Sequence, residues 1–136
     1  MTMQTIKIKT LEKQRMVDVT KQVQQRVKES GVISGVCTVF CPHTTAAVTL
    51  QENSDPDVKL DLLDALDRAV PAKANYRDAD GNSAAHVKAS LIGSSITMFV
   101  ENGKLVLGSW QAVFFCEFDG PRDRSLLVRV SGDPSA

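Results

Sequence analysis

No apolar run in this chain approaches the roughly 20 residues that a membrane-spanning helix needs. The first ten residues interleave Lys7 and Lys9 with Ile6 and Ile8, whereas a signal peptide places its charges before an apolar block. This segment is therefore typical of a half-buried strand. We expect no membrane partner and no secretory leader.

The chain also lacks an excess of charge and has few cysteines. Sixteen lysines and arginines balance sixteen aspartates and glutamates, which argues against a nucleic-acid partner because such proteins usually carry a basic excess. A small basic pocket for a phosphorylated metabolite remains compatible with this balance. The three cysteines, Cys37, Cys41 and Cys116, form an odd set without a secretory signal, which indicates a reducing, cytoplasmic location.

The sequence contains no Gly-x-Gly-x-x-Gly, no P-loop and no Gly-x-Ser-x-Gly, so nothing predicts a nucleotide-binding fold or a serine hydrolase. Its 136 residues, with 43% hydrophobic and 24% charged side chains, are ordinary for a globular protein. This length predicts one domain over residues 1–136, large enough to bury a core without disulfides.

Hydrophobic periodicity predicts blocks of strands and helices and no strict β-α-β alternation. Val19, Val23 and Val27 form the buried stripe of one helix, and Val58, Leu62, Leu66 and Val70 that of the next. Asn102-Gly103 predicts a hairpin turn. Asp18 or Thr20 is expected to cap a first helix that runs to about residue 30 and is ended by Gly31. Asp55-Pro56 is expected to begin a second helix that runs to about residue 69, and Asn82 or Ser83 to cap a third through about residue 91. Strands are expected over 5–10, 14–19, 32–41, 45–51, 95–100, 104–118 and 125–131. The fold class is α+β, with a mainly antiparallel sheet and two to three helices.

The two histidines, His43 and His86, are candidates for metal binding or acid–base chemistry, although each taken alone is as compatible with a structural role. Cys41 and His43 lie two apart and would point the same way from an extended strand, but a buried apolar cysteine is the favoured interpretation. Residues 78–82 resemble the start of a calcium loop, but Gly81 comes too early for an EF-hand. Asp78 could still supply a carboxylate near His86.

Acidic and aromatic residues supply further candidates. Asp61 and Asp64 lie beyond the first turn of the second helix, where the helix dipole no longer explains them, so one of them is a functional candidate. Trp110 and Gln111 are adjacent in a predicted strand and would face opposite sides, one toward the core and one toward a site.

Glu117 lies among Phe114, Phe115, Cys116 and Phe118 and must be satisfied by a cation, a donor or a proton if it is buried. Arg122 and Arg124 follow closely, and either could pair with Glu117 or bind a phosphate. The residues alone leave a structural ion pair and a functional pair equally open.

Five segments form an ordered set along the chain: 43–47, 52–58 with Asp61, 81–82 with His86, 107–111, and Glu117 with Arg124. Together these segments resemble the YjbQ family, also called the secondary thiamine-phosphate synthase family. The resemblance covers about residues 6–132. It implies a homotrimer with a metal site and a weak thiamine-phosphate synthase activity, in which a hydroxymethylpyrimidine diphosphate couples to a thiazole phosphate with release of pyrophosphate.

The resemblance also assigns roles. His43, His86 and Asp78 would hold a divalent metal, zinc or magnesium, with Asp78 standing where many relatives carry a third histidine. Substrate-binding residues would be Thr45, Asn53, Trp110 and Gln111, and catalytic ones Glu117, Asp61 and Arg124. We therefore expect His43 and His86 to approach each other in space. The alternative functions are a metal-dependent hydrolase of a small phosphorylated or acyl compound, and a trimeric metabolite-binding or regulatory protein without physiological catalysis.

Overall fold

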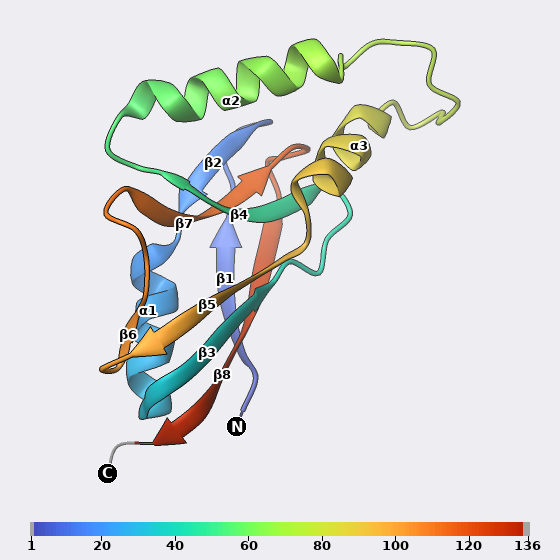
Figure 1. Cartoon of the computed structure of the whole chain (residues 1–136). Coiled ribbons are helices and arrows are strands. Elements are labelled where there is room, and N and C mark those ends of the chain that lie inside the picture. Colours follow the sequence, from blue (N-terminus) through green and yellow to red (C-terminus); the bar gives the residue numbers. More distant parts are fainter. Residues whose placement is uncertain (1, 135–136) are drawn as a thin grey trace.

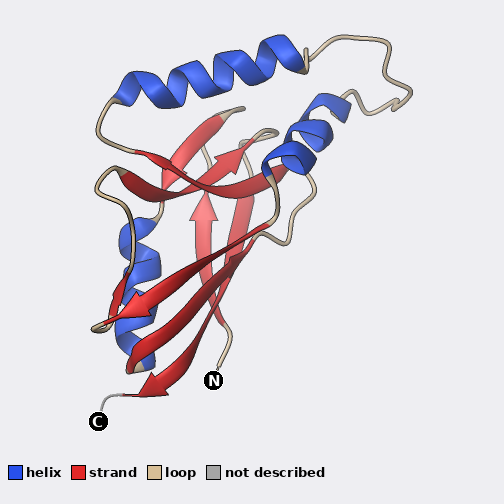
Figure 2. Cartoon of the chain, in the orientation of Figure 1, coloured by secondary structure: helices blue, strands red, loops and turns tan. Residues whose placement is uncertain are grey.

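The computed structural model describes residues 2–134 of the chain (Figures 1 and 2). The strands of this part are β1 (Gln4–Lys9), β2 (Arg15–Asp18), β3 (Val32–Phe40), β4 (Ala46–Glu52), β5 (Ser95–Glu101), β6 (Lys104–Leu105), β7 (Gln111–Glu117) and β8 (Asp123–Pro134). The helices are α1 (Thr20–Ser30), α2 (Pro56–Ala69) and α3 (Ser83–Ile92). None of these helices is long and apolar enough to cross a membrane.

The strands form two sheets, and every strand pair in them is antiparallel. One sheet has five strands in the order β1-β8-β3-β5-β6, and the other has three in the order β2-β7-β4. Helix α1 runs alongside the five-stranded sheet, whereas α2 and α3 lie at the end occupied by the three-stranded sheet (Figure 1). The predicted α+β fold with a mainly antiparallel sheet is confirmed.

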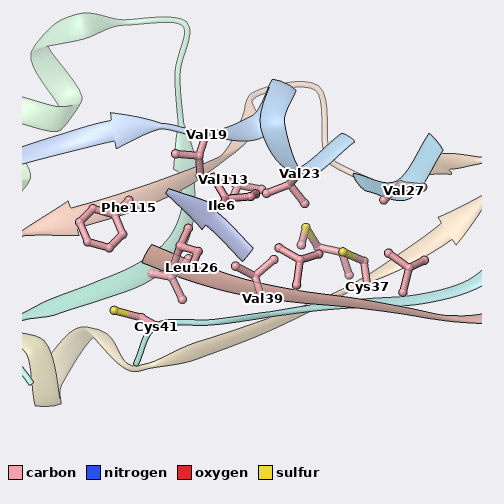
Figure 3. Close-up of a cluster of buried hydrophobic side chains, with 14 of the residues drawn as sticks. Ile6, Val19, Val23, Val27, Cys37, Val39, Cys41, Val113, Phe115 and Leu126 are labelled. Carbon is pink, nitrogen blue, oxygen red and sulfur yellow. The ribbon is translucent and has the colours of Figure 1, made fainter. Parts of the chain in front are cut away.

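The main core lies between α1 and the sheets (Figure 3). Val19, Val23 and Val27 are fully buried, as their spacing predicted, and they pack in one cluster with Phe115 and Leu126. Gly31 ends α1 in the left-handed conformation, at φ 72°, which glycine adopts without a steric cost. The apolar stripe of α1 thus packs on the inner face of the five-stranded sheet, together with inward residues of β4 and β7.

Strand β7 is buried on both faces. Val113 and Phe115 belong to the main core, whereas Ala112, Phe114 and Cys116 point the other way into a second cluster beneath α2 and α3. This double burial explains why residues 112–116 are apolar without alternation. Glu117 continues the alternation of Val113 and Phe115, which directs its side chain inward.

Helix α2 departs from the predicted burial. Asp55 caps it by accepting a hydrogen bond from the Asp57 N–H at 2.9 Å, and Pro56 occupies the first turn, as expected. The expected stripe over 58–70 is only half-buried within the helix, and Val70, just past its end, is the buried member. The reason is that α2 contacts the protein along one side only, where leucines rest on the second cluster.

The strand expected over 104–118 is interrupted. Strand β6 ends at Leu105, and residues 106–110 carry the chain from the five-stranded sheet to the three-stranded one, where β7 begins at Gln111. Trp110 therefore lies outside a strand. The Asn102-Gly103 hairpin is confirmed: both residues have positive φ, 54° and 72°, and Glu101 pairs with Lys104.

Candidate functional site

A buried ion pair joins the two sheets at the start of β8. Nε and Nη2 of Arg124 donate hydrogen bonds to Oε1 and Oε2 of Glu117 at 2.9 and 2.5 Å. Glu117 is fully buried and Arg124 nearly so. The turn over 118–122 brings the two residues together and leads from the three-stranded sheet to the five-stranded one.

Three more groups complete this network. Oγ1 of Thr10 donates to Oε1 of Glu117 at 2.6 Å, and the N–H of Asp119 donates to Oε2 at 3.1 Å. Burial alone would raise the pKa of the Glu117 carboxyl, but the hydrogen bonds from Arg124 and Thr10 outweigh it and hold that pKa below its usual range. Arg124 Nη2 also donates to Oγ1 of Thr45 at 2.8 Å. Glu117 is therefore an ionised acceptor that orients Arg124.

His43 lies next to this network, just beyond the end of β3. Its Nε2 accepts a hydrogen bond from the Ser125 N–H at 3.0 Å, and its ring stands edge-on to Phe115 with centroids 6.5 Å apart. Burial and the charge of Arg124 lower the pKa of the imidazole. A nitrogen that accepts a hydrogen bond carries no proton, so His43 is neutral and its Nδ1 bears the hydrogen.

Two clefts meet at His43. The first, here the histidine cleft, measures about 370 Å³. It is lined by His43, Thr44, Ala46, His86, Ala89, Ser90, Gly93 and Ser94. The second, here the lysine cleft, measures about 520 Å³. It is lined by Thr5, Lys7, Ile8, Lys9, His43, Asp123, Arg124 and Ser125. The two histidines thus line one cleft. The resemblance implied that they approach each other in space.

The third expected metal ligand lies elsewhere. Asp78 is exposed in the loop between α2 and α3, where its Oδ1 accepts a hydrogen bond from the Asp80 N–H at 3.0 Å, and it lines neither cleft. Within residues 2–134, no three His, Cys, Asp or Glu side chains gather as metal ligands. The Nε2 of His43 is moreover engaged with Ser125. The donors within the described residues therefore do not fit a three-ligand metal centre.

The remaining candidates lie away from His43. Ala46 pairs with Glu117 at one end of β4 and β7, whereas Glu52 pairs with Gln111 at the other, six residues or about 20 Å away. Near that far end the Asn53 N–H donates to the carbonyl of Trp110 at 3.0 Å. Trp110 is exposed, and Gln111 accepts from the Gly108 N–H. Asp61 is exposed on α2 and lines neither cleft at His43.

Sequence reasoning missed three residues of the site. Thr10 bonds Glu117 across 107 residues of sequence, and no local pattern reports a contact of that range. For Lys7 and Lys9 the sequence predicts only a place in a half-buried strand. Their alternation with Ile6 and Ile8 predicts that the two lysines share one face of the strand. That His43 lies beside this face depends on the tertiary structure.

The fold and these clefts define a small antiparallel α+β protein with a histidine-lined cleft beside a buried carboxylate–guanidinium pair. The chain belongs to the UPF0047 protein YjbQ-like family, whose family model matches residues 4–133. It is 45% identical over 131 residues to the UPF0047 protein YugU of Bacillus subtilis, covering 96% of this chain and 99% of the relative. A UPF0047 protein of Methanocaldococcus jannaschii is 44% identical over 126 residues, covering 93% and 91%.

Solved structures resemble the fold closely. An uncharacterised conserved protein of the YjbQ/UPF0047 family from Clostridium acetobutylicum is 50% identical, with a TM-score of 0.92 over 93% of this chain and 98% of that one. A protein of unknown function from Sulfolobus solfataricus is 32% identical, with a TM-score of 0.93 over 97% of both chains. The expected family and fold are therefore confirmed.

Proposed function

We propose that this protein is a transferase of the thiamine-phosphate synthase type, which couples a hydroxymethylpyrimidine diphosphate to a thiazole phosphate and releases pyrophosphate. The observation that carries the proposal is the position of His43, between two clefts and beside the ordered guanidinium of Arg124. A condensation of two molecules needs two adjacent sites, and a diphosphate leaving group needs positive charge.

Each residue of the network has a part in this proposal. Glu117 and Thr45 hold Arg124 in one orientation, which makes them positioning residues, while Arg124 supplies positive charge beside His43. The Nδ1–H of neutral His43 is a donor for a substrate oxygen. The substrate-binding roles of Asn53, Trp110 and Gln111, and the catalytic role of Asp61, stay predictions.

Metal, assembly and location also stay proposals. Zinc or magnesium is expected from the resemblance, but no step of the proposal passes through it because residues 2–134 of one chain do not gather a ligand set.

A homotrimer is proposed from the resemblance, with support from exposed apolar side chains on the outer face of the five-stranded sheet. The proposed location is the cytoplasm, with a small phosphorylated metabolite as partner; the three buried cysteines are free thiols.

The direct test is to incubate the purified protein with both precursors and to quantify thiamine phosphate and pyrophosphate by mass spectrometry. We expect both products in equal amounts, and Arg124→Lys should reduce the rate at least about tenfold because bidentate geometry is lost. The matched control is Arg68→Lys, an exposed arginine in the last turn of α2, which should keep the wild-type rate.

Other outcomes would contradict the synthase. Release of phosphate or pyrophosphate without thiamine phosphate would favour the hydrolase. Tight binding of a precursor without turnover would favour the regulatory protein. Adding zinc or magnesium after dialysis against a chelator would show whether the activity depends on a metal.

A further inference from the structure

The two clefts that meet at His43 differ in chemistry. The lysine cleft carries the ammonium groups of Lys7 and Lys9, whereas His86 is the only titratable side chain beside His43 in the lining of the histidine cleft. Both volumes, about 520 and 370 Å³, fall in the range of small-molecule sites. Because His43 lines both, a molecule in either cleft can reach the same side chain.

The lysine cleft is built from the outer face of two paired strands. Lys7 lies opposite Ser125 and Lys9 opposite Asp123 in the antiparallel register of β1 and β8, so these four side chains share one face. Among residues 2–134, neither lysine forms a salt bridge with a carboxylate. Asp123 is the single carboxylate of the lining, so the cleft has an excess of positive charge even though the whole chain has none.

The His43 end of the cleft is rigid. The Ser125 N–H holds the imidazole at 3.0 Å, and Arg124, the neighbouring residue, is fixed by Glu117 and Thr45. An anion in the cleft therefore meets a preformed wall together with two exposed ammonium groups. This combination suits a group with several charged oxygens, such as a diphosphate, because each lysine ammonium can bind a different oxygen.

We propose that the lysine cleft binds the diphosphate of the pyrimidine substrate through Lys7 and Lys9, and that the histidine cleft holds the second substrate. This inference rests on the proposed function and deepens it. The bond between the pyrimidine methylene carbon and the diphosphate oxygen breaks, and its electron pair leaves with pyrophosphate. The lone pair of the thiazole nitrogen forms the new carbon–nitrogen bond, so no further reactant is required.

Binding of inorganic pyrophosphate, measured by calorimetry on the whole protein, tests the lysine cleft without any turnover. We expect saturable binding to the wild type and a loss of at least about tenfold in affinity for the double variant K7M/K9M. The matched control K21M/K28M removes two exposed lysines from α1 and should bind within about twofold of the wild type. Asp123→Asn should bind about threefold more tightly because it removes the opposing charge.

Amide NMR shifts locate the bound pyrophosphate. The Ser125 amide should shift on titration in the wild type and stay unchanged in K7M/K9M. Equal affinity of K7M/K9M and wild type, or weaker binding in K21M/K28M alone, would overturn the assignment. Circular dichroism confirms that the variants are folded.

Failure of the inference and failure of the proposed function give different results. Pyrophosphate bound through Lys7 and Lys9 by a protein that makes no thiamine phosphate would leave the cleft assignment standing and remove the synthase. If K7M/K9M instead makes thiamine phosphate with an unchanged KM for the pyrimidine diphosphate, the synthase stands and the assignment of the lysine cleft is wrong.

Discussion

Glu117 and Arg124 hold each other through two hydrogen bonds although they belong to different sheets, one at the end of β7 and the other at the start of β8. The pair therefore links the three-stranded sheet to the five-stranded one at the point where His43 separates two clefts. Both charges are buried away from water, so the attraction between them compensates for the hydration that each has lost.

Removing one member of this pair should destabilise the protein. Glu117→Gln leaves the Arg124 charge buried without a counter-charge, and we expect a loss of about 3 kcal/mol in the free energy of unfolding. Removing both charges in E117Q/R124M should cost less than the two single changes added together. Urea unfolding of all four proteins in a double-mutant cycle measures this coupling, and additive losses would contradict it.

Asp119 should contribute stability that disappears in acid. Burial alone would raise the pKa of its carboxyl, but hydrogen bonds from Lys13, Asn82 and Arg122 lower it from 3.8 to about 2. Because the folded-state pKa lies below the unfolded one, the contribution is complete above about pH 5 and is lost as the pH falls toward 2.

The size of this contribution is about 2 kcal/mol, since each pKa unit corresponds to about 1.4 kcal/mol. Asp119→Asn should therefore be less stable than the wild type by this amount at pH 7, and the difference should vanish near pH 2. Denaturant unfolding at several pH values checks it. A difference that is independent of pH would show that packing and not charge is involved.

Gly120 should not tolerate a side chain. A Cβ at this position would lie 2.2 Å from the carbonyl oxygen of Glu12 and 2.9 Å from both Cγ of Glu117 and Oγ1 of Thr10. Gly120→Ala should therefore lower the unfolding free energy by about 3 kcal/mol and disturb the Thr10–Glu117 hydrogen bond. Thermal unfolding measures the loss.

The control for Gly120 is Gly81→Ala. Gly81 has φ +77°, but a Cβ at this position would meet nothing within 4 Å, so only backbone strain opposes the change. We expect a cost of about 1 kcal/mol. Equal losses in the two variants would show that close packing at Gly120 is unimportant.

The proposed homotrimer predicts that the outer face of the five-stranded sheet is covered. Val36, Phe40 and Phe99 are 36%, 43% and 69% exposed on this sheet in the isolated chain. Sedimentation equilibrium should give a trimer for the wild type, and Phe99→Asp should weaken it because a charge would enter the contact. Leu11→Asp, at a residue that is 74% exposed outside the sheet, serves as the control and should leave assembly unchanged. A monomeric wild type at micromolar concentration would contradict the prediction.

Local signals allowed much of the fold to be predicted. Asp55-Pro56 marked the start of α2, Gly31 the end of α1, and Asn102-Gly103 a hairpin, because each depends on backbone geometry within a few residues. The break between β6 and β7 was missed. Apolar residues lie on both sides of it, and the chain changes sheet there without a proline to interrupt the pattern.

The site was less accessible to sequence reasoning because its contacts are long-range. The pairing of Glu117 with Arg124 was open to prediction, since only seven residues separate them and a buried carboxylate needs a partner. The bond between His43 and Ser125 spans 82 residues and depends on where β3 ends beside β8. The position of Asp78 also depends on tertiary structure, because its loop carries it away from both clefts.

The weak burial of α2 has a consequence for the order in which the protein opens. This helix has no buried residue, and its polar attachment runs through Asp67, which accepts hydrogen bonds from Lys88 at 2.5 Å and Gln14 at 3.1 Å. Val23 and Val27 of α1 are, by contrast, completely enclosed. In hydrogen–deuterium exchange we expect the amides of α2 to exchange by local opening while those of α1 require global unfolding. This expectation divides the molecule into two cooperative units. One is α2, which opens locally, and the other is α1 with the sheets, which keeps its structure when α2 opens.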